Sequence, residues 1–369
     1  MAEKLAEVYD KYNIEIVSTR RGRGATILTT TDGLYILEPF RGSVNRLEQE
    51  YVLKRLFEKE GFCNLDQLIP NQGDELITYD RYHQPFVLKH HFSGEECDMH
   101  NLSDVVRAVE RLAQFHQMGQ SVVAAFDEEW EAEKAKKEQM QFEEIKQALA
   151  AGEELEQVAR LYGMTPIGLK EFVKEKECGI ESDVKDIPKL SETESANRML
   201  TTFVRRNREL RKIRKFVGGV KRKNSFELLF MQIFEAFYQK GVQCERTYEN
   251  VMEQQGETDQ GFASHYGICH GNYNQHNVIL DDNRVAIVHL EKFTRGNQLD
   301  DLYQFARKVM EKNHFDYEML EMILESYGKY IPLNKEDYRY RYVLFSYPEK
   351  FWKIANGYYN TNKAFLSPK

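Results

Sequence analysis

Cysteine is scarce in this chain, with five residues among 369. Their number is odd and no pair has the spacing of metal ligands, so the sequence predicts neither a zinc site nor a disulfide framework. Scattered cysteines without such a framework favour synthesis in a reducing cytoplasm. The five are Cys63, Cys97, Cys178, Cys244 and Cys269.

Long apolar runs are absent as well. The first residues, Met1 to Leu5, lack the apolar core of a signal peptide, and no stretch reaches the roughly 20 apolar residues that cross a bilayer. We therefore expect no signal peptide and no membrane span. An excess of positive charge is also missing. The net charge is −8, which argues against nucleic-acid binding by the chain as a whole.

The chain does contain enough apolar material for a large folded protein. Hydrophobic residues make up 41% of it, aromatic residues 12% and charged residues 30%, a balance typical of globular proteins. A length of 369 residues exceeds what one hydrophobic core usually supports. Two lobes or domains are therefore expected.

The first ninety residues predict a small sheet with one helix. Asp32-Gly33 between two apolar runs is a strong hairpin signal. Ser43 can cap a helix over 43–59, whose apolar residues recur at helical spacing. The expected strands cover residues 14–18, 25–30, 34–37, 75–79 and 86–90.

From residue 101 onward the apolar spacing is mainly helical. We predict a helix over 103–118 and one or two long helices over 201–240. The expected domains are an N-terminal lobe over 1–90 and a helical C-terminal lobe over 91–369.

Residues 127–196 have the pattern of a helical insertion in the second lobe. A charged helix is expected over 127–151, and two short helices are expected within 155–175. The polar residues 181–196 are predicted to form a loop.

A strongly basic stretch covers residues 205–223. It has two interpretations: a solvated helix face that balances the acidic remainder, or a docking surface for an anionic partner. Its basic residues are Arg205, Arg206, Arg208, Arg211, Lys212, Arg214, Lys215, Lys221, Arg222 and Lys223.

Residues 270–277 read His-Gly-Asn-Tyr-Asn-Gln-His-Asn, the frame of a phosphotransferase catalytic loop. In such loops an aspartate accepts the proton of the substrate hydroxyl. His270 is expected to be the structural histidine, and Asn277 stands in the metal-ligand position. Asn272 occupies the position of the base. A carboxamide cannot accept a proton at neutral pH, although it can orient a hydroxyl.

The third predicted strand should supply a lysine that pairs with phosphate oxygens and with a helix glutamate. Glu38 stands there instead, and its charge would repel a phosphate. Glu48 or Glu50, on the following helix, would be the partner of that lysine and then has no lysine to hold. Gly22 and Gly24 lie where a phosphate-covering turn belongs and are the candidate nucleotide-binding glycines, although a bare hairpin turn would look the same. Arg41 or Arg46 is a substitute phosphate cation, although the pattern places neither of them.

A strand expected over 285–291 should end on an aspartate that binds magnesium. His289 holds that position, and imidazole is a poor ligand for Mg²⁺. Glu291 shares a strand face with His289 and is a candidate replacement ligand. Loss of the phosphate cation, the base and the metal ligand together removes on the order of 10 kcal/mol of transition-state stabilisation, if each contributes a few.

Several stretches spread along the chain resemble the CotS-type spore-coat family, within the aminoglycoside/choline phosphotransferase type of kinase-like proteins. The resemblance covers most of the chain outside 127–196. The matching stretches are RGRGA, FSGEECD, RAVERLAQFH, RNRELRKIRKFV, KRKNSFELLF, HGNYNQHNVIL, QLDDLYQFARKVMEKN and SYPEKFWKIANGYYNTNKAF.

The resemblance implies an α+β, two-lobed kinase-like fold with a small β-rich N-lobe and a large helical C-lobe. It also implies a place in the spore coat among coat-protein partners. It carries over Asn277 as a metal-position residue and Asp301 as a structural aspartate. It cannot carry over catalysis at Asn272, His289 or Glu38, where the chain departs from the family's chemistry.

Three hypotheses follow. The first is a catalytically impaired kinase-like protein that binds or scaffolds spore-coat components. The second is an active phosphotransferase, using ATP and Mg²⁺, in which Glu291 and Asn277 hold the metal and Asn272 orients the acceptor. The third is a module that binds an anionic polymer through the basic stretch.

Overall fold

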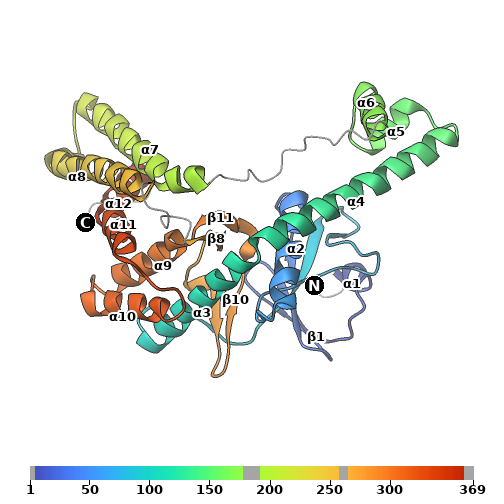
Figure 1. The fold of residues 1–369 in the computed structure, drawn as a ribbon, viewed down its shortest axis with the longest axis horizontal. Coiled ribbons are helices and arrows are strands. Elements are labelled where there is room, and N and C mark those ends of the chain that lie inside the picture. The colour runs from blue at the N-terminus through green and yellow to red at the C-terminus, as the bar shows by residue number, and fades with distance from the viewer. Residues whose placement is uncertain (1–4, 178–191, 257–264, 361–369) are drawn as a thin grey trace. The chain divides into compact units, whose positions relative to one another are not determined.

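The computed structural model describes residues 5–177, 192–256 and 265–360 (Figure 1). The chain divides into two compact units. The larger comprises Met1–Ser121 and Leu190–Lys369, and the smaller comprises Val122–Lys189. The predicted insertion over 127–196 overlaps the smaller unit.

A six-stranded antiparallel sheet forms the N-terminal part of the larger unit, in the order β1-β2-β3-β6-β4 with β5 paired to β6. The predicted hairpin is confirmed, because β2 pairs with β3 around Gly33, whose φ is 142°. The strands are β1 (Ile16–Arg21), β2 (Thr26–Thr30), β3 (Leu34–Pro39), β4 (Leu68–Ile69), β5 (Thr78–Tyr79) and β6 (Pro85–His90).

Two helices accompany this sheet. Helix α2 (Val44–Lys59) confirms the predicted helix, and its buried Leu47 packs with Leu68 and Val87 of the sheet. Helix α1 (Ala6–Tyr9) buries Val8 in a second apolar cluster formed by β2, β3 and β6. Burial of these apolar side chains is what fixes the order of the strands.

The C-terminal part of the larger unit is helical, with two small sheets. Strands β7 (Glu95–Glu96), β9 (Val278–Leu280) and β10 (Val285–Ile287) form one sheet. Strands β8 (Tyr266–Cys269) and β11 (Thr294–Asn297) form the other. The helices are α3 (Leu102–Ser121), α7 (Glu192–Gly219), α8 (Ser225–Gly256), α9 (Leu299–Lys312), α10 (Tyr317–Gly328), α11 (Lys335–Ser346) and α12 (Glu349–Asn360), with 3₁₀ turns η3 (Gln275–Asn277) and η4 (Leu290–Lys292).

The smaller unit is a helical unit with its own core. It contains α4 (Val123–Ala150), α5 (Leu155–Leu161) and α6 (Pro166–Glu177), which confirms the predicted helices of this region. Ile145, Val158 and Leu169 are fully buried where the three helices meet. Among the helices described, none combines the length and apolar character that a bilayer crossing needs.

Three predicted elements differ from the structure. The strand predicted over 75–79 is only the two residues of β5, because the side chain of Asn71 holds the backbone of Gly73 and Glu75 in a turn. Residues 192–196 of the predicted loop belong to α7, and residues 181–191 lie outside the described part of the chain. The strand predicted over 285–291 ends at Ile287, because His289 has a left-handed backbone with φ 65° that a strand cannot contain.

Candidate functional site

The loop over 270–277 is held at its start by one buried carboxylate. Asp301, on α9, accepts hydrogen bonds from the backbone nitrogens of His270 (2.6 Å) and Gly271 (3.0 Å). Its Oδ2 also lies 3.3 Å from Nε2 of His116 on α3. A carboxylate with several donors is strongly fixed, so Asp301 sets the position where the loop leaves β8.

His270 ties the same loop to the segment after β10. Its Nε2 donates to the carbonyl oxygen of Val288 (3.0 Å), and its Nδ1 accepts from the backbone nitrogen of Asn272 (3.3 Å). Burial lowers the pKa of His270, which fits a neutral ring with one donor and one acceptor nitrogen. The ring is fully enclosed, so it is placed to position the loop.

The two asparagines at the predicted base and metal positions are joined to each other. Nδ2 of Asn277 donates to the carbonyl oxygen of Asn272 (2.9 Å), as does Nδ2 of Asn274 (2.7 Å). With its amide nitrogen engaged in this hydrogen bond, the group that Asn277 can offer a cation is its side-chain oxygen. The assignment of Asn272 to the base position and Asn277 to the metal position stays a prediction.

A buried lysine stands where the sequence analysis expected none. Lys89, on β6, is 2% exposed and lies opposite Ile36 of β3, two residues before Glu38. Its Nζ lies 2.7 Å from Oε1 of Glu291, 3.4 Å from Oε2 of Glu38 and 3.9 Å from Oδ2 of Asp66. Burial lowers the pKa of Lys89, but the surrounding carboxylates outweigh it and raise the pKa. Lys89 therefore carries a permanent charge.

Lys54 is a second lysine that sequence reasoning missed. It is fully buried on α2 and binds Glu50 (2.5 Å) and Asp66 (2.6 Å). Glu50, predicted to have no lysine partner, thus holds the lysine one turn further along its own helix. The sequence did hold a signal for this pairing. A lysine inside an apolar run is placed to be buried, and a buried lysine is nearly always paired with an acidic group. Asp66 contacts both lysines and links them into one network.

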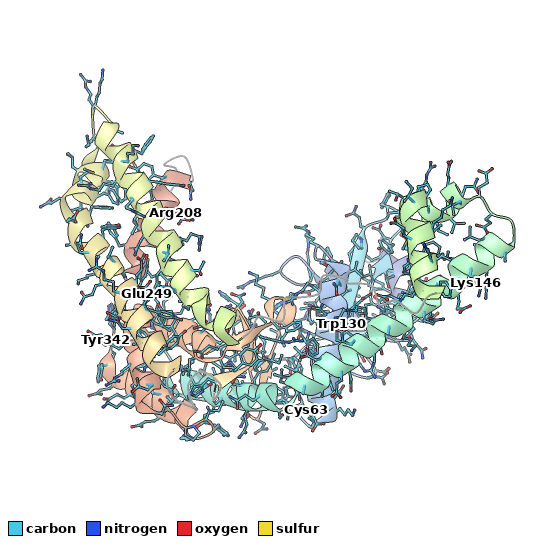
Figure 2. All side chains as sticks on the ribbon, turned by 45° about the horizontal axis from the view of Figure 1, so that its top comes forward. Cys63, Trp130, Lys146, Arg208, Glu249 and Tyr342 are labelled. Carbon is cyan, nitrogen blue, oxygen red and sulfur yellow. The ribbon has the colours of Figure 1, made fainter. Side chains whose placement is uncertain are left out.

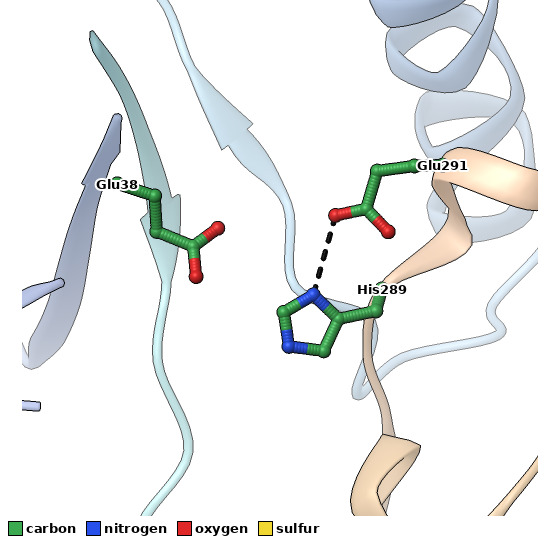
Figure 3. A group of neighbouring side chains, drawn as sticks. All are labelled: Glu38, His289 and Glu291. Carbon is green, nitrogen blue, oxygen red and sulfur yellow. Dashed lines mark hydrogen bonds and ion pairs between the residues drawn. The ribbon is translucent and has the colours of Figure 1, made fainter. Parts of the chain in front are cut away.

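His289 and Glu291 meet across a turn rather than along a strand. Nδ1 of His289 lies 3.2 Å from Oε1 of Glu291, and Glu38 of β3 faces both from the other side (Figure 3). One ligand atom from each of the three lies within 4.8 Å of the others. The hydrogen bond to Glu291 raises the pKa of His289. Burial raises the pKa of Glu291, but His289 and Lys89 more than offset this and lower it.

The kinase-like resemblance implies ATP with Mg²⁺, and the donor set here does not fit that ion. Mg²⁺ requires nearly octahedral oxygen ligands. The position that should supply a carboxylate oxygen supplies the imidazole of His289. Glu291 is the nearby acid, and its Oε1 is shared between Lys89 and His289.

Gly22 and Gly24 form a tight turn between β1 and β2, with a hydrogen bond from the nitrogen of Gly22 to the oxygen of Ala25 (2.9 Å) and a φ of 74° at Gly24. At the tip of this turn, Arg23 binds Glu96 of β7 (2.9 Å). The other carboxylate oxygen of Glu96 contacts Nδ1 of His276 in the loop. A chain of exposed polar side chains thus connects the glycine turn to the loop.

Two cavities adjoin these residues. One of about 320 Å³ is lined by Glu38, Lys89 and Glu291, and by Arg46 of α2. Arg46, suggested as a phosphate cation, donates instead to the carbonyl oxygens of Glu291 and Phe293. The second cavity, of about 240 Å³, lies beside the loop. Its lining includes Arg205, Arg206, Gly271, Asp300, Asp301 and Glu349.

Comparison with known proteins places the fold. No family model and no curated protein matches the chain. Among solved structures, an aminoglycoside phosphotransferase from Alicyclobacillus acidocaldarius is similar, with a TM-score of 0.67, 14% identity, and coverage of 97% of this chain and 86% of that one. The AMP-bound spectinomycin phosphotransferase APH(9)-Ia has a TM-score of 0.52 and 13% identity, with 99% and 90% covered. The chain therefore has the α+β, two-lobed kinase-like fold of the aminoglycoside phosphotransferase type, with a small β-rich N-lobe and a large helical C-lobe.

Proposed function

We propose that this chain is a kinase-fold protein without phosphoryl-transfer activity that acts as a binding or scaffolding component of the endospore coat. One observation carries the first half of the proposal. The charges that a phosphotransferase directs at phosphate and metal are here directed at each other, with Lys89 bound to Glu291 and Glu38. In addition, the predicted base position holds Asn272, whose carboxamide does not accept a proton at neutral pH. The coat assignment is supported by the sequence resemblance.

The energetic argument concerns what a nucleotide would have to displace. Lys89 is almost completely buried among carboxylates, and removing one partner of such a group costs about 3–5 kcal/mol. A phosphate that recruited Lys89 would strip Glu291 and Glu38 of their counter-charge. The same phosphate would approach those two acids directly, which is repulsive. Productive nucleotide binding is disfavoured on both counts.

A thermal-shift titration with ATP, with and without Mg²⁺, tests the absence of phosphotransferase function. A ligand that binds the native state raises the unfolding midpoint by mass action, so we expect no shift under either condition. Mg²⁺-dependent turnover of ATP that is abolished by Asn277→Ala or Glu291→Ala would contradict the proposal.

Fractionation of spores tests the coat assignment separately. A tagged chain expressed in its sporulating host should be recovered in the coat extract. Recovery only in the soluble fraction of the mother cell would overturn this half of the proposal and leave the other half standing.

The outward face of α7 is the candidate surface for an anionic coat partner. Arg208, Arg211, Lys212 and Lys215 are all exposed on this helix, and Arg208 is labelled on it in Figure 2. We name these four residues the basic face. Like charges gathered on one face attract an anionic partner at long range.

Two parts of the predicted basic stretch do not belong to this face. Arg206 is turned inward, with its side chain 14% exposed, 3.5 Å from Glu349 and stacked on Trp352. Residues 221–223 lie between α7 and α8 and not on a helix.

Binding to an acidic polypeptide such as polyglutamate tests the basic face. Binding should weaken steeply as salt is added, because exposed charges are screened, and it should be lost when Arg208, Arg211 and Lys215 are all changed to glutamate. Arg339→Glu on α11 is the matched control, since it reverses an exposed arginine away from the basic face. Binding that survives the triple reversal would exclude this surface.

An active phosphotransferase is the second candidate, and the cavity of about 240 Å³ beside Gly271 and Asp301 favours it. A small acceptor could occupy this cavity next to Asn272, with Glu291 and Asn277 as metal ligands. Calorimetry that shows no nucleotide binding, with or without Mg²⁺, would eliminate this candidate.

A further inference from the structure

We propose that Glu38, His289 and Glu291 form a binding site for a divalent transition-metal ion such as Zn²⁺, and that this site discriminates against Mg²⁺. The three side chains come from β3, from the residue that precedes η4, and from η4 itself. Figure 3 shows their polar ends directed toward a common point. The inference goes beyond the proposed function and does not depend on it.

The geometry suits a small ion with few ligands. Zinc binds imidazole nitrogen and carboxylate oxygen at about 2.0–2.2 Å, which places tetrahedral ligand atoms about 3.4 Å apart. One ligand atom from each of the three side chains lies within 4.8 Å of the others, and a bound metal would replace the hydrogen bond between Nδ1 of His289 and Oε1 of Glu291. Closing a separation of 4.8 Å to that spacing takes a side-chain movement of little more than an ångström. Its neighbouring cavity, which Glu291 also lines, leaves room for ligand waters.

The charge balance also favours a cation. Four carboxylates, those of Glu38, Glu50, Asp66 and Glu291, face two ammonium groups within ion-pair distance. Arg46 is a further cation nearby, and its guanidinium is held by backbone carbonyls. Four carboxylates against Lys54, Lys89 and Arg46 leave one negative charge in excess when the imidazole of His289 is neutral, which is the form that binds a metal. Each carboxylate also has two oxygens, so contact with Lys89 does not use up its capacity to bind a metal.

The ligand types decide which metal is preferred. Imidazole suits zinc, copper, iron and nickel, whereas Mg²⁺ favours oxygen ligands throughout. Glu38 is the distinctive member of the set. It comes from the strand that the sequence analysis expected to supply a lysine to phosphate, so that strand here contributes an acid to a cation site.

Calorimetric titration of the metal-free full chain tests the site. The exposed Cys63 is changed to serine throughout, because a free thiol binds zinc. We expect one equivalent of Zn²⁺ to bind and Mg²⁺ to give no heat. Either Glu38→Gln or His289→Asn should weaken binding at least about tenfold. Asparagine is chosen at 289 because it tolerates the left-handed backbone there.

His276→Asn is the matched control, since His276 is the other half-exposed histidine in contact with a glutamate. Substitution with Co²⁺ supplies a second measurement that is independent of stability, because the intensity of its visible absorption distinguishes a low-coordinate protein-bound ion from the hydrated ion. That absorption should disappear in His289→Asn and persist in His276→Asn. Absence of metal binding, or equal binding by all three variants, would overturn the inference without bearing on ATP turnover.

Discussion

Replacing Lys89 by methionine is the most informative single change to this molecule. Methionine keeps the length and apolar stem of the side chain and removes only its charge. Three carboxylates then lose a counter-charge inside the larger unit: Glu291, Glu38 and Asp66. Removing one partner of a buried ion pair costs about 3–5 kcal/mol.

The surroundings of the carboxylates indicate that the loss of stability in Lys89→Met lies at the lower end of this range of energies. Asp66 has a side chain that is only 5% exposed, but it keeps Lys54 at 2.6 Å. Glu291 has a side chain that is 46% exposed and can turn to water. We therefore expect Lys89→Met to lower the free energy of unfolding by about 3 kcal/mol, which corresponds to a roughly 150-fold change in the folding equilibrium constant.

The two tryptophans of the chain provide the assay. Trp352, on α12, belongs to the larger unit and donates from Nε1 to Glu209 (2.7 Å). Trp130 belongs to the smaller unit. In a Trp130→Phe background, urea unfolding followed by tryptophan fluorescence reports the larger unit alone.

The matched control is Arg339→Met, which breaks a 2.9 Å ion pair with Glu336 whose arginine is 48% exposed. Such surface pairs contribute under about 1 kcal/mol. If Lys89→Met and Arg339→Met destabilise the larger unit equally, the buried network is not the stabilising element described above.

The pH dependence of the same variant gives a second test with a definite sign. The lysines lower the pKa of Asp66, and His289 with Lys89 lowers that of Glu291, in both cases against burial. A carboxylate with a lowered pKa stabilises the fold above its unfolded pKa, near 4, and this contribution is lost as the pH falls. The difference in the free energy of unfolding between the unchanged chain and Lys89→Met should therefore become smaller below about pH 4. A difference that stayed constant at acid pH would refute the conclusion that these carboxylates are stabilised by Lys89.

Three further predictions follow from the loop and its support. Asn272→Asp alone should give no ATP turnover in a coupled assay, because it restores the base while Lys89 stays bound to carboxylates and His289 still replaces the magnesium-binding aspartate. Gly271→Ala should destabilise the fold by about 1–3 kcal/mol in urea unfolding, because φ is 76° there and a Cβ would collide with the carbonyl of Lys292; Gly357→Ala, in open space on α12, should not. Because burial lowers the pKa of His116, the free energy of unfolding should fall as the pH drops below about 6.5.

The catalytic-loop frame could be predicted from the sequence because its residues are close together along the chain. His270, Asn272 and Asn277 are within eight positions of one another, and the structure joins them through local hydrogen bonds. Lys89 could not be assigned in the same way. Its proximity to Glu38 depends on the register between β3 and β6, two strands that are separated by about fifty residues and paired by packing in three dimensions.

The backbone conformation of residues 289–291 is another feature that the sequence pattern did not predict. A run of apolar residues predicted a strand, and strand geometry would have put His289 and Glu291 on one face. The structure brings the two side chains together through a left-handed residue and a 3₁₀ turn. The proximity of the two side chains was predicted, but the strand conformation on which that prediction rested was wrong. A sequence pattern does not reveal a positive φ at a residue other than glycine.

The chain of Arg23, Glu96 and His276 has a consequence for the mobility of the glycine turn. All three side chains are substantially exposed, and exposed ion pairs contribute about 0–1 kcal/mol each. The turn is therefore held to the loop only weakly. It can move away from the loop while the two lobes stay joined by the contacts of Lys89 with Glu291 and of Asp66 with the backbone nitrogen of His289.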